Sequence, residues 1–133
     1  MKSRYLLPIL PYLFSPLAFA DDCDNAKTQT DMNQCAARQN QAADKALNDV
    51  YRQISQRLKA SPAAKKQLVS AQRAWLVFRD AECTFSASGV TGGSAWPLVY
   101  ADCLKTQNIA RTQALKGYLA CEEGDLSCPV PRQ

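Results

Sequence analysis

This 133-residue sequence contains six cysteines and no histidine. The six cysteines are Cys23, Cys35, Cys83, Cys103, Cys121 and Cys128. An even number of cysteines in a short exported chain is typical of structural disulfides, and a disulfide sulfur is neither a nucleophile nor a thiolate ligand. Without histidine, Ser-His-Asp and Cys-His catalysis and histidine-ligated zinc are also excluded.

Carboxylates are the remaining candidates for catalysis. Asp80 and Glu82 are two positions apart on a predicted helix, so they point in different directions, whereas glycoside hydrolysis needs two carboxyl groups facing one bond. The glycines at positions 89, 92 and 93 lack the lysine that a phosphate-binding loop requires. We therefore expect no catalytic residue, no metal site, no cofactor and no enzymatic activity.

Two sets of side chains with helical spacing are candidates for binding. They are Asp44, Asn48 and Tyr51 in the first set, and Gln72, Trp75 and Arg79 in the second. The two sets can meet in a helical hairpin, either as a polar recognition site or as a structural network. In the network, Arg79 would pair with Asp44 or Asp80 and lie on the ring of Trp75. We favour the network, because inward positions on amphipathic helices usually serve packing.

Two loops are further candidates. Residues 88–94 form a connection rich in glycine and serine that includes Ser94, and long helix connections often carry binding function. The second loop holds Glu122, Glu123 and Asp125 between two cysteines. These carboxylates would form one acidic patch with Asp21, Asp22 and Asp24 if the two ends of the chain met.

The first twenty residues read as a cleavable signal peptide. Lys2 and Arg4 precede an apolar run, and Ala18-Phe19-Ala20 offers small residues before a cut at Asp21. The run is too short and too rich in proline for a membrane anchor. We therefore expect a periplasmic or secreted protein without a membrane span.

The remaining 113 residues suit one domain. Their net charge is +2, since two of the 16 basic residues lie in the leader, and no basic block is present. Nucleic acid is therefore not expected as a partner.

Hydrophobic periodicity predicts an all-α fold with three main helices. The first spans about residues 30–60, with Thr28 or Thr30 as its cap, and Ser61-Pro62 both ends it and begins the second. The second ends at the glycines of residues 88–93, and Ser94 would cap the third. The expected inward stripes are Met32, Ala36, Ala43, Leu47, Tyr51, Ile54 and Leu58; then Ala64, Leu68, Ala71, Trp75, Phe78 and Phe85; then Trp96, Tyr100, Cys103, Ala110 and Ala114.

Three helices bury only a modest core, for which disulfides would compensate. Six cysteines allow fifteen pairings. We favour Cys23–Cys35, Cys83–Cys103 and Cys121–Cys128, because each closes a local loop, although Cys35 or Cys103 could instead reach a different helix. After the last cysteine, Pro129 and Pro131 predict a frayed tail.

The order of residues also resembles a known family. The matching positions are Cys23, Thr30 to Cys35, Ala43-Asp44, Leu47-Asn48, Tyr51, Gln72 to Trp75, Phe78 to Asp80, Cys83, Gly92 to Ser94, Cys103, Thr106 and Arg111-Thr112. They are similar to the lysozyme inhibitor LprI-like N-terminal domain family of small exported bacterial proteins. The resemblance spans residues 23–119 and implies a helical, disulfide-bonded envelope protein. It divides the chain into a signal peptide (1–20), a helical domain (21–120) and an added disulfide-closed loop and tail (121–133).

Two functions from different classes follow. The first is an exported binding protein whose partner is lysozyme or a related peptidoglycan hydrolase, which it inhibits by occlusion rather than by chemistry. The alternative is a non-catalytic accessory of the cell envelope that holds another exported protein. An exposed apolar stripe would favour the accessory, and the sequence leaves the oligomeric state open.

Overall fold

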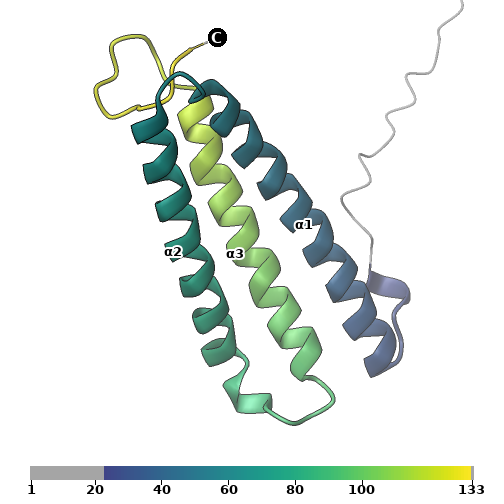
Figure 1. Ribbon diagram of the computed structural model, residues 1–133. Coiled ribbons are helices and arrows are strands. Elements are labelled where there is room, and N and C mark those ends of the chain that lie inside the picture. Colours follow the sequence, from purple (N-terminus) through teal and green to yellow (C-terminus); the bar gives the residue numbers. More distant parts are fainter. Residues whose placement is uncertain (1–22, 133) are drawn as a thin grey trace, which may run out of the picture.

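Three long helices form most of the computed structural model, which describes residues 23–132 (Figure 1). They are α1 (Gln29–Arg57), α2 (Pro62–Ser86) and α3 (Trp96–Leu119), with short 3-10 helices η1 (Cys23–Asn25) and η2 (Ser88–Val90) beside them. No strand occurs within the described residues. The predicted all-α fold with three main helices is confirmed, whereas the predicted signal peptide lies outside the described residues.

The helix ends follow the predicted signals in part. Thr28 caps α1, since its Oγ1 accepts a hydrogen bond from the amide of Asp31 at 3.0 Å. Pro62 is the first residue of α2, where no amide donor is needed. Ser61 occupies the position before α2, but its hydroxyl makes no capping hydrogen bond.

The prediction that Ser94 caps α3 is wrong. Ala95 is the residue that precedes α3, and no side chain caps this end. Ser94 instead lies within a tight turn that continues up to the helix, in which the amide of Trp96 donates to the carbonyl of Gly93 at 3.2 Å. The turn thus already binds the amide of Trp96, which a capping side chain of Ser94 would otherwise accept from.

The arrangement of the helices places α3 between α1 and α2 (Figure 1). The short link between α1 and α2 makes them antiparallel, and α3 runs in the direction of α1. It packs chiefly against α1 and more sparsely against α2. None of the helices within residues 23–132 combines the length and apolarity that a membrane span requires.

The apolar core lies at the end of the bundle where α1 and α3 finish. Its buried members are Leu47, Val50, Ile54, Leu58, Leu115 and Val130, and Tyr51, Leu68, Trp75 and Leu119 pack against them. Val130 belongs to the C-terminal tail and is only 6% exposed. The prediction of a frayed tail is therefore wrong. Val130, which lies between Pro129 and Pro131, packs in the core and anchors the tail there.

The three disulfides join the pairs that the sequence favoured: Cys23–Cys35, Cys83–Cys103 and Cys121–Cys128. The first ties η1 to α1, the second ties α2 to α3, and the third closes the loop of residues 121–128. All six cysteines are thereby used.

The predicted inward stripe of α2 is partly wrong. Phe78 is 54% exposed and Phe85 is 75% exposed, and Ala71 is exposed as well. The disulfide of Cys83 fixes how α2 is rotated toward α3. Phe85 lies two residues further on, about 200° around the helix axis, and so points away from the bundle.

The predicted stripe of α3 needs a similar correction. Ala110 and Ala114 are exposed, whereas Ala101, Asn108 and Leu115 are buried. These three buried positions recur every seven residues and face α1, on which α3 mainly packs. The alanines therefore cover the outside of the helix.

Asp24 and the carboxylates near the C-terminus do not meet. Asp24 lies in η1 beside the start of α1, whereas the loop of residues 121–128 lies at the opposite end of the bundle (Figure 1). Asp21 and Asp22 lie outside the described residues. The C-terminal carboxylates therefore form a separate feature.

Candidate functional site

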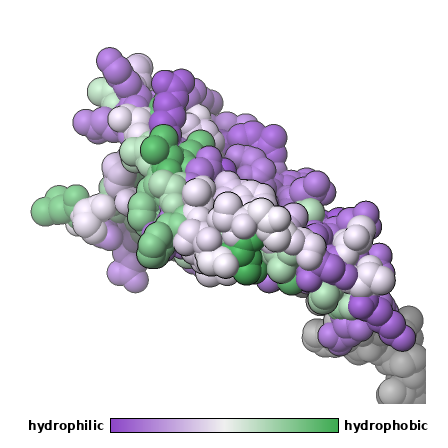
Figure 2. All heavy atoms as spheres, turned by 90° about the horizontal axis from the view of Figure 1, so that it is seen from below, coloured by the Kyte–Doolittle hydropathy of each residue, from purple (hydrophilic) through white to green (hydrophobic). Residues whose placement is uncertain are grey.

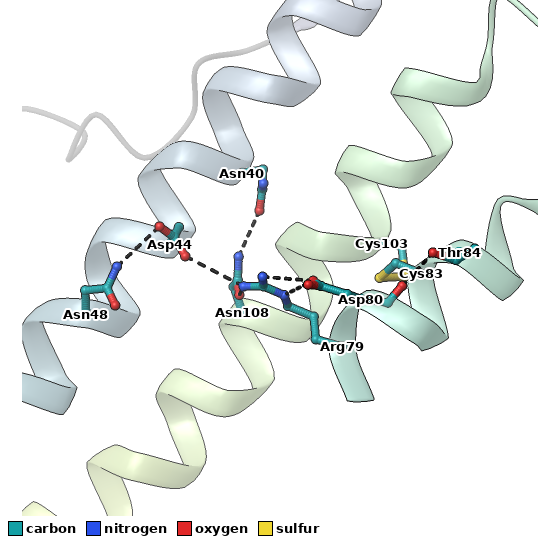
Figure 3. A network of polar contacts seen from close by, with 9 residues as sticks. All are labelled: Asn40, Asp44, Asn48, Arg79, Asp80, Cys83, Thr84, Cys103 and Asn108. Carbon is teal, nitrogen blue, oxygen red and sulfur yellow. Dashed lines mark hydrogen bonds and ion pairs between the residues drawn. A yellow bond between two sulfur atoms is a disulfide. The ribbon is translucent and has the colours of Figure 1, made fainter. Parts of the chain in front are cut away.

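The centre of the bundle contains a polar network that joins all three helices, shown in Figure 3. Its hub is Asn108 of α3, which is 1% exposed. The side-chain amide of Asn108 donates to Oδ1 of Asn40 on α1 at 2.9 Å, and its Oδ1 accepts from Arg79 on α2 at 3.1 Å. One buried amide therefore sets the alignment of α3 relative to both neighbours.

Arg79 makes the charged contacts of the network, and its side chain is only 15% exposed. Its Nε donates to Asp80 at 2.9 Å, and its Nη1 lies 3.8 Å from Oδ1 of Asp44 on α1. The other carboxylate oxygen of Asp44 accepts from Asn48 at 3.3 Å. These contacts match the structural network predicted from the sequence, in which Arg79 pairs with Asp44 or Asp80. Both carboxylates lie next to the guanidinium of Arg79.

Two guanidinium groups lie over the ring of Trp75. Arg79 is 5.5 Å from the centre of a Trp75 ring, and Arg111 of α3 is 5.8 Å away, both within the range of cation-π attraction. Arg111 also donates through Nε to Gln72 at 3.0 Å, and Gln72 is 8% exposed. We call Asn40, Asp44, Gln72, Trp75, Arg79, Asn108 and Arg111 the central network.

Burial disfavours the charged form of Arg111 in the network. Desolvation lowers the pKa of Arg111 below its ordinary value, and the neighbouring Tyr118 partly offsets this shift. A guanidinium stays protonated at any physiological pH. No buried side-chain nitrogen or oxygen within the described residues lacks a hydrogen-bond partner. Every buried polar atom of the network therefore has a hydrogen-bond partner.

A shallow groove borders the network between α1 and α2. It has a volume of about 370 Å³, and its lining includes Asp44, Asn48, Tyr51 and Gln72. The structure thus brings together both sets of side chains that the helical spacing singled out. Because Asp44, Gln72 and the amide nitrogen of Asn48 already have partners, the groove offers mainly apolar surface to a ligand.

Sequence reasoning missed Asn40 and Asn108, and it gave Arg111 no role. A signal was present, because Asn108 lies seven residues from both Ala101 and Leu115. A lone asparagine at that spacing in an apolar stripe is typical of a position that specifies helix register. The exposed alanines of α3 obscured this pattern.

The connection of residues 88–94 is tied to α1. Asn33 donates through Nδ2 to the carbonyl of Ser94 at 3.0 Å. Beyond it, the rings of Trp96 and Tyr100 stack with centres 4.6 Å apart. Ser94 therefore takes part in a structural contact through its backbone, apart from the central network.

The loop of residues 121–128, which we call the acidic loop, lies apart from the network at the end of the bundle. Its disulfide joins its two ends, and Gly124 allows a tight turn with φ of 85°. Glu122, Glu123 and Asp125 are exposed, and Leu126 is fully exposed at 102%. A hollow of about 400 Å³ lies between the loop and the tail, lined by the three carboxylates and Arg132.

The electrostatics of the loop are local. Asp125 accepts hydrogen bonds from the hydroxyl of Ser127 at 2.6 Å and from its amide at 2.9 Å, which lower the pKa of this carboxyl. Arg132 lies 4.0 Å from Glu123, and both side chains are largely exposed, so this pair is weak. A net negative surface remains on the loop.

Comparison with known proteins supports the resemblance found in the sequence. The pattern of a family described as lysozyme inhibitor LprI matches residues 20–115, which include the central network but not the acidic loop. A protein of Rhizobium meliloti (strain 1021), described as uncharacterized, is 33% identical over 113 residues, covering 77% of this chain and 81% of the relative. No solved structure matches. The chain therefore belongs to the lysozyme inhibitor LprI family.

Proposed function

We propose that this protein is exported to the periplasm or the medium, where it binds a lysozyme-like peptidoglycan hydrolase and blocks its cleft. The observation that carries the proposal is the family match over residues 20–115, since the family is described by lysozyme inhibition. The three disulfides support an oxidising compartment. Inhibition by occlusion needs a stable shape rather than reactive groups, and the fully paired central network supplies stability.

The acidic loop is the contact that we propose for the hydrolase. It stands clear of the helices at one end of the bundle (Figure 1). Its shape is held by the disulfide at its base and by Val130 in the core. A loop that is already ordered loses little conformational entropy when it enters a cleft.

Two properties suit the loop to a cationic enzyme. Glu122, Glu123 and Asp125 attract a positively charged surface, and the hollow beside them has room for a lysine or arginine side chain. Leu126 offers an apolar contact at the tip, where burial in a cleft is favourable. Because the loop lies outside the family match, it would give this member its own target preference.

The test measures hydrolysis of suspended peptidoglycan by a purified cationic lysozyme with increasing amounts of the oxidised protein. We expect the rate to fall toward zero in molar excess. Leu126→Ser and Glu122→Gln/Glu123→Gln should each weaken inhibition at least about tenfold. The matched controls are Ile109→Ser, at an exposed apolar residue of α3, and Glu82→Gln/Asp102→Asn, which remove the same charge elsewhere.

The outcomes separate the proposals. A hydrolysis rate that does not change in excess protein contradicts inhibition itself. If the loop variants inhibit as well as the unchanged protein, the contact lies on the helices that match the family. The groove beside Asn48 is then the next candidate.

The second candidate function is that of an envelope accessory that holds another exported protein. The observation that favours it is the exposed apolar surface of α2, which includes Val77, Phe78 and Phe85. Recovery of an envelope complex without any hydrolase, in pull-downs from the periplasm, would support this function over inhibition.

A further inference from the structure

The outward side of α2 carries an apolar stripe that nothing in residues 23–132 covers. Its members are Ala71, Ala74, Val77, Phe78, Ala81 and Phe85, and all of them are exposed. Val77 is 72% exposed and Phe85 is 75% exposed. Figure 2 shows apolar residues gathered on the side where α2 lies in Figure 1. We call this stripe the outer face.

The spacing of the outer face is that of a coiled-coil seam. Residues 71, 74, 78, 81 and 85 follow one another in steps of three and four, which is the heptad pattern of a helix that packs along another helix. The opposite side of α2 already packs on α3 through its inward residues, which include Gln72, Arg79 and Cys83. The inward side of α2 therefore meets α3 and, through Arg79 and the core, α1, whereas the outer face has no partner within the described residues.

The side chains along this seam alternate between small and large. Ala74 is followed by Phe78, and Ala81 is followed by Phe85. If a second copy of α2 packs antiparallel with the two-fold axis between residues 79 and 80, Phe78 lies opposite Ala81 of the second copy and Phe85 lies opposite its Ala74. Every phenylalanine then meets an alanine, which is the size match that a self-complementary two-fold interface requires.

Charge and area also favour a second copy. None of the six residues of the outer face is charged, so a two-fold axis brings no like charges together. The face is equally unsuited to attract a cationic enzyme. Phe78 and Phe85 expose about 250 Å² together, and Val77 and the alanines expose roughly as much again, so complete burial in two copies would remove about 1,000 Å², the lower limit for a specific interface.

We propose that the outer face of α2 is a homodimer interface, in which two copies pair antiparallel through Phe78 and Phe85. The acidic loop lies at the end of the bundle and takes no part in this contact. Dimerisation therefore stands independently of lysozyme inhibition.

The test measures the mass of the oxidised protein without the leader of residues 1–20, by analytical ultracentrifugation over a range of concentrations. We expect a reversible monomer-dimer equilibrium. Phe85→Ser should raise the dimer dissociation constant at least about tenfold, whereas Ile109→Ser on α3 should leave it unchanged. Far-UV circular dichroism should show unchanged helix content in both variants, because both positions are exposed.

A swap of large and small residues tests the antiparallel register. Ala81→Phe should abolish the dimer, because two phenylalanines would then collide across the axis. Phe78→Ala/Ala81→Phe should restore it, because each layer again pairs one phenylalanine with one alanine.

Three outcomes would overturn the proposal. The first is a monomer at every concentration, and the second is a dimer that Phe85→Ser does not weaken. The third is a double swap that fails to recover association although Ala81→Phe has removed it. If the protein is monomeric alone and a different envelope protein slows hydrogen exchange in α2, the outer face binds that protein instead.

Discussion

The central network and the acidic loop both concentrate polar side chains, but they satisfy them differently. In the network, buried groups such as Asn108 and Gln72 find partners on neighbouring helices. In the acidic loop, Glu122 and Glu123 face solvent, and Leu126 has no cover at all. Paired polar groups hold a fold together, whereas unpaired ones remain available to a partner. The comparison shows that the residues singled out by helical spacing already bind one another, so they are less available to a partner than the residues of the acidic loop.

Removal of Arg79 should give the largest effect and tests whether the network is structural. Arg79→Ala leaves a buried oxygen of Asn108 without its donor and exposes one face of Trp75. We expect a loss of about 3 kcal/mol in the free energy of unfolding, measured by urea denaturation. Arg79→Lys should lose less, because it keeps the charge but not the planar fork.

The same variants sharpen the comparison when inhibition is measured on the folded protein. Inhibition per folded molecule should not change in Arg79→Lys. A marked loss of inhibition without a loss of stability would transfer the functional role from the acidic loop to the network.

Opening the acidic loop should have the next largest effect. Cys121→Ser/Cys128→Ser removes a disulfide that closes a short loop, and we expect a loss of about 2 kcal/mol in chemical denaturation. Inhibition should fall more than stability, because a loop that must be ordered on binding adds an entropic cost. Equal inhibition by the open and closed loop would show that the contact lies elsewhere.

Shortening the tail anchor tests how the loop is attached. Val130→Ala removes two buried methyl groups from the core, and we expect a loss of about 1–2 kcal/mol in unfolding free energy. Arg132→Ala, which alters an exposed neighbour, is the control and should change stability by less than about 0.5 kcal/mol. Equal effects of the two substitutions would contradict the anchoring role of Val130.

The smallest expected effect concerns Asp125. The hydrogen bonds from Ser127 lower its pKa in the folded state, so they stabilise the fold above the pKa of the unfolded chain. This contribution is lost as the pH falls through the lower, folded pKa. Ser127→Ala keeps only the amide donor, so the pKa of Asp125 should rise toward its ordinary value in an NMR titration. A titration that the substitution leaves unchanged would show that the amide alone sets this pKa.

Local signals in the sequence were enough for the helices and the disulfides. Thr28 and Pro62 mark helix starts through backbone hydrogen bonding, which depends only on neighbouring residues. The favoured disulfides join cysteines that are near in sequence, so each pair could be chosen from the local loop that it closes. Ser94 misled the prediction, because its turn competes with the cap that serine usually provides.

The candidate site was predictable only in outline. Helical spacing placed Asp44 near Arg79, and both occur in the network. It did not indicate that α3 would lie between the two helices and provide Asn108 and Arg111, since that depends on how three helices pack. The exposure of Leu126 and the burial of Val130 were equally invisible, because both depend on the path of the tail.

The sequence by itself determined the helical content and the family, because these follow from local spacing and residue order, and it favoured the disulfide pairs that the structure contains without excluding others. Only the tertiary structure decided which side of α2 faces inward. Hydrophobic periodicity places Phe78 and Phe85 on one stripe but does not say what covers that stripe. The bond from Cys83 to α3 and the contacts of Arg79 turn the polar side inward, and that rotation leaves the two phenylalanines on the surface.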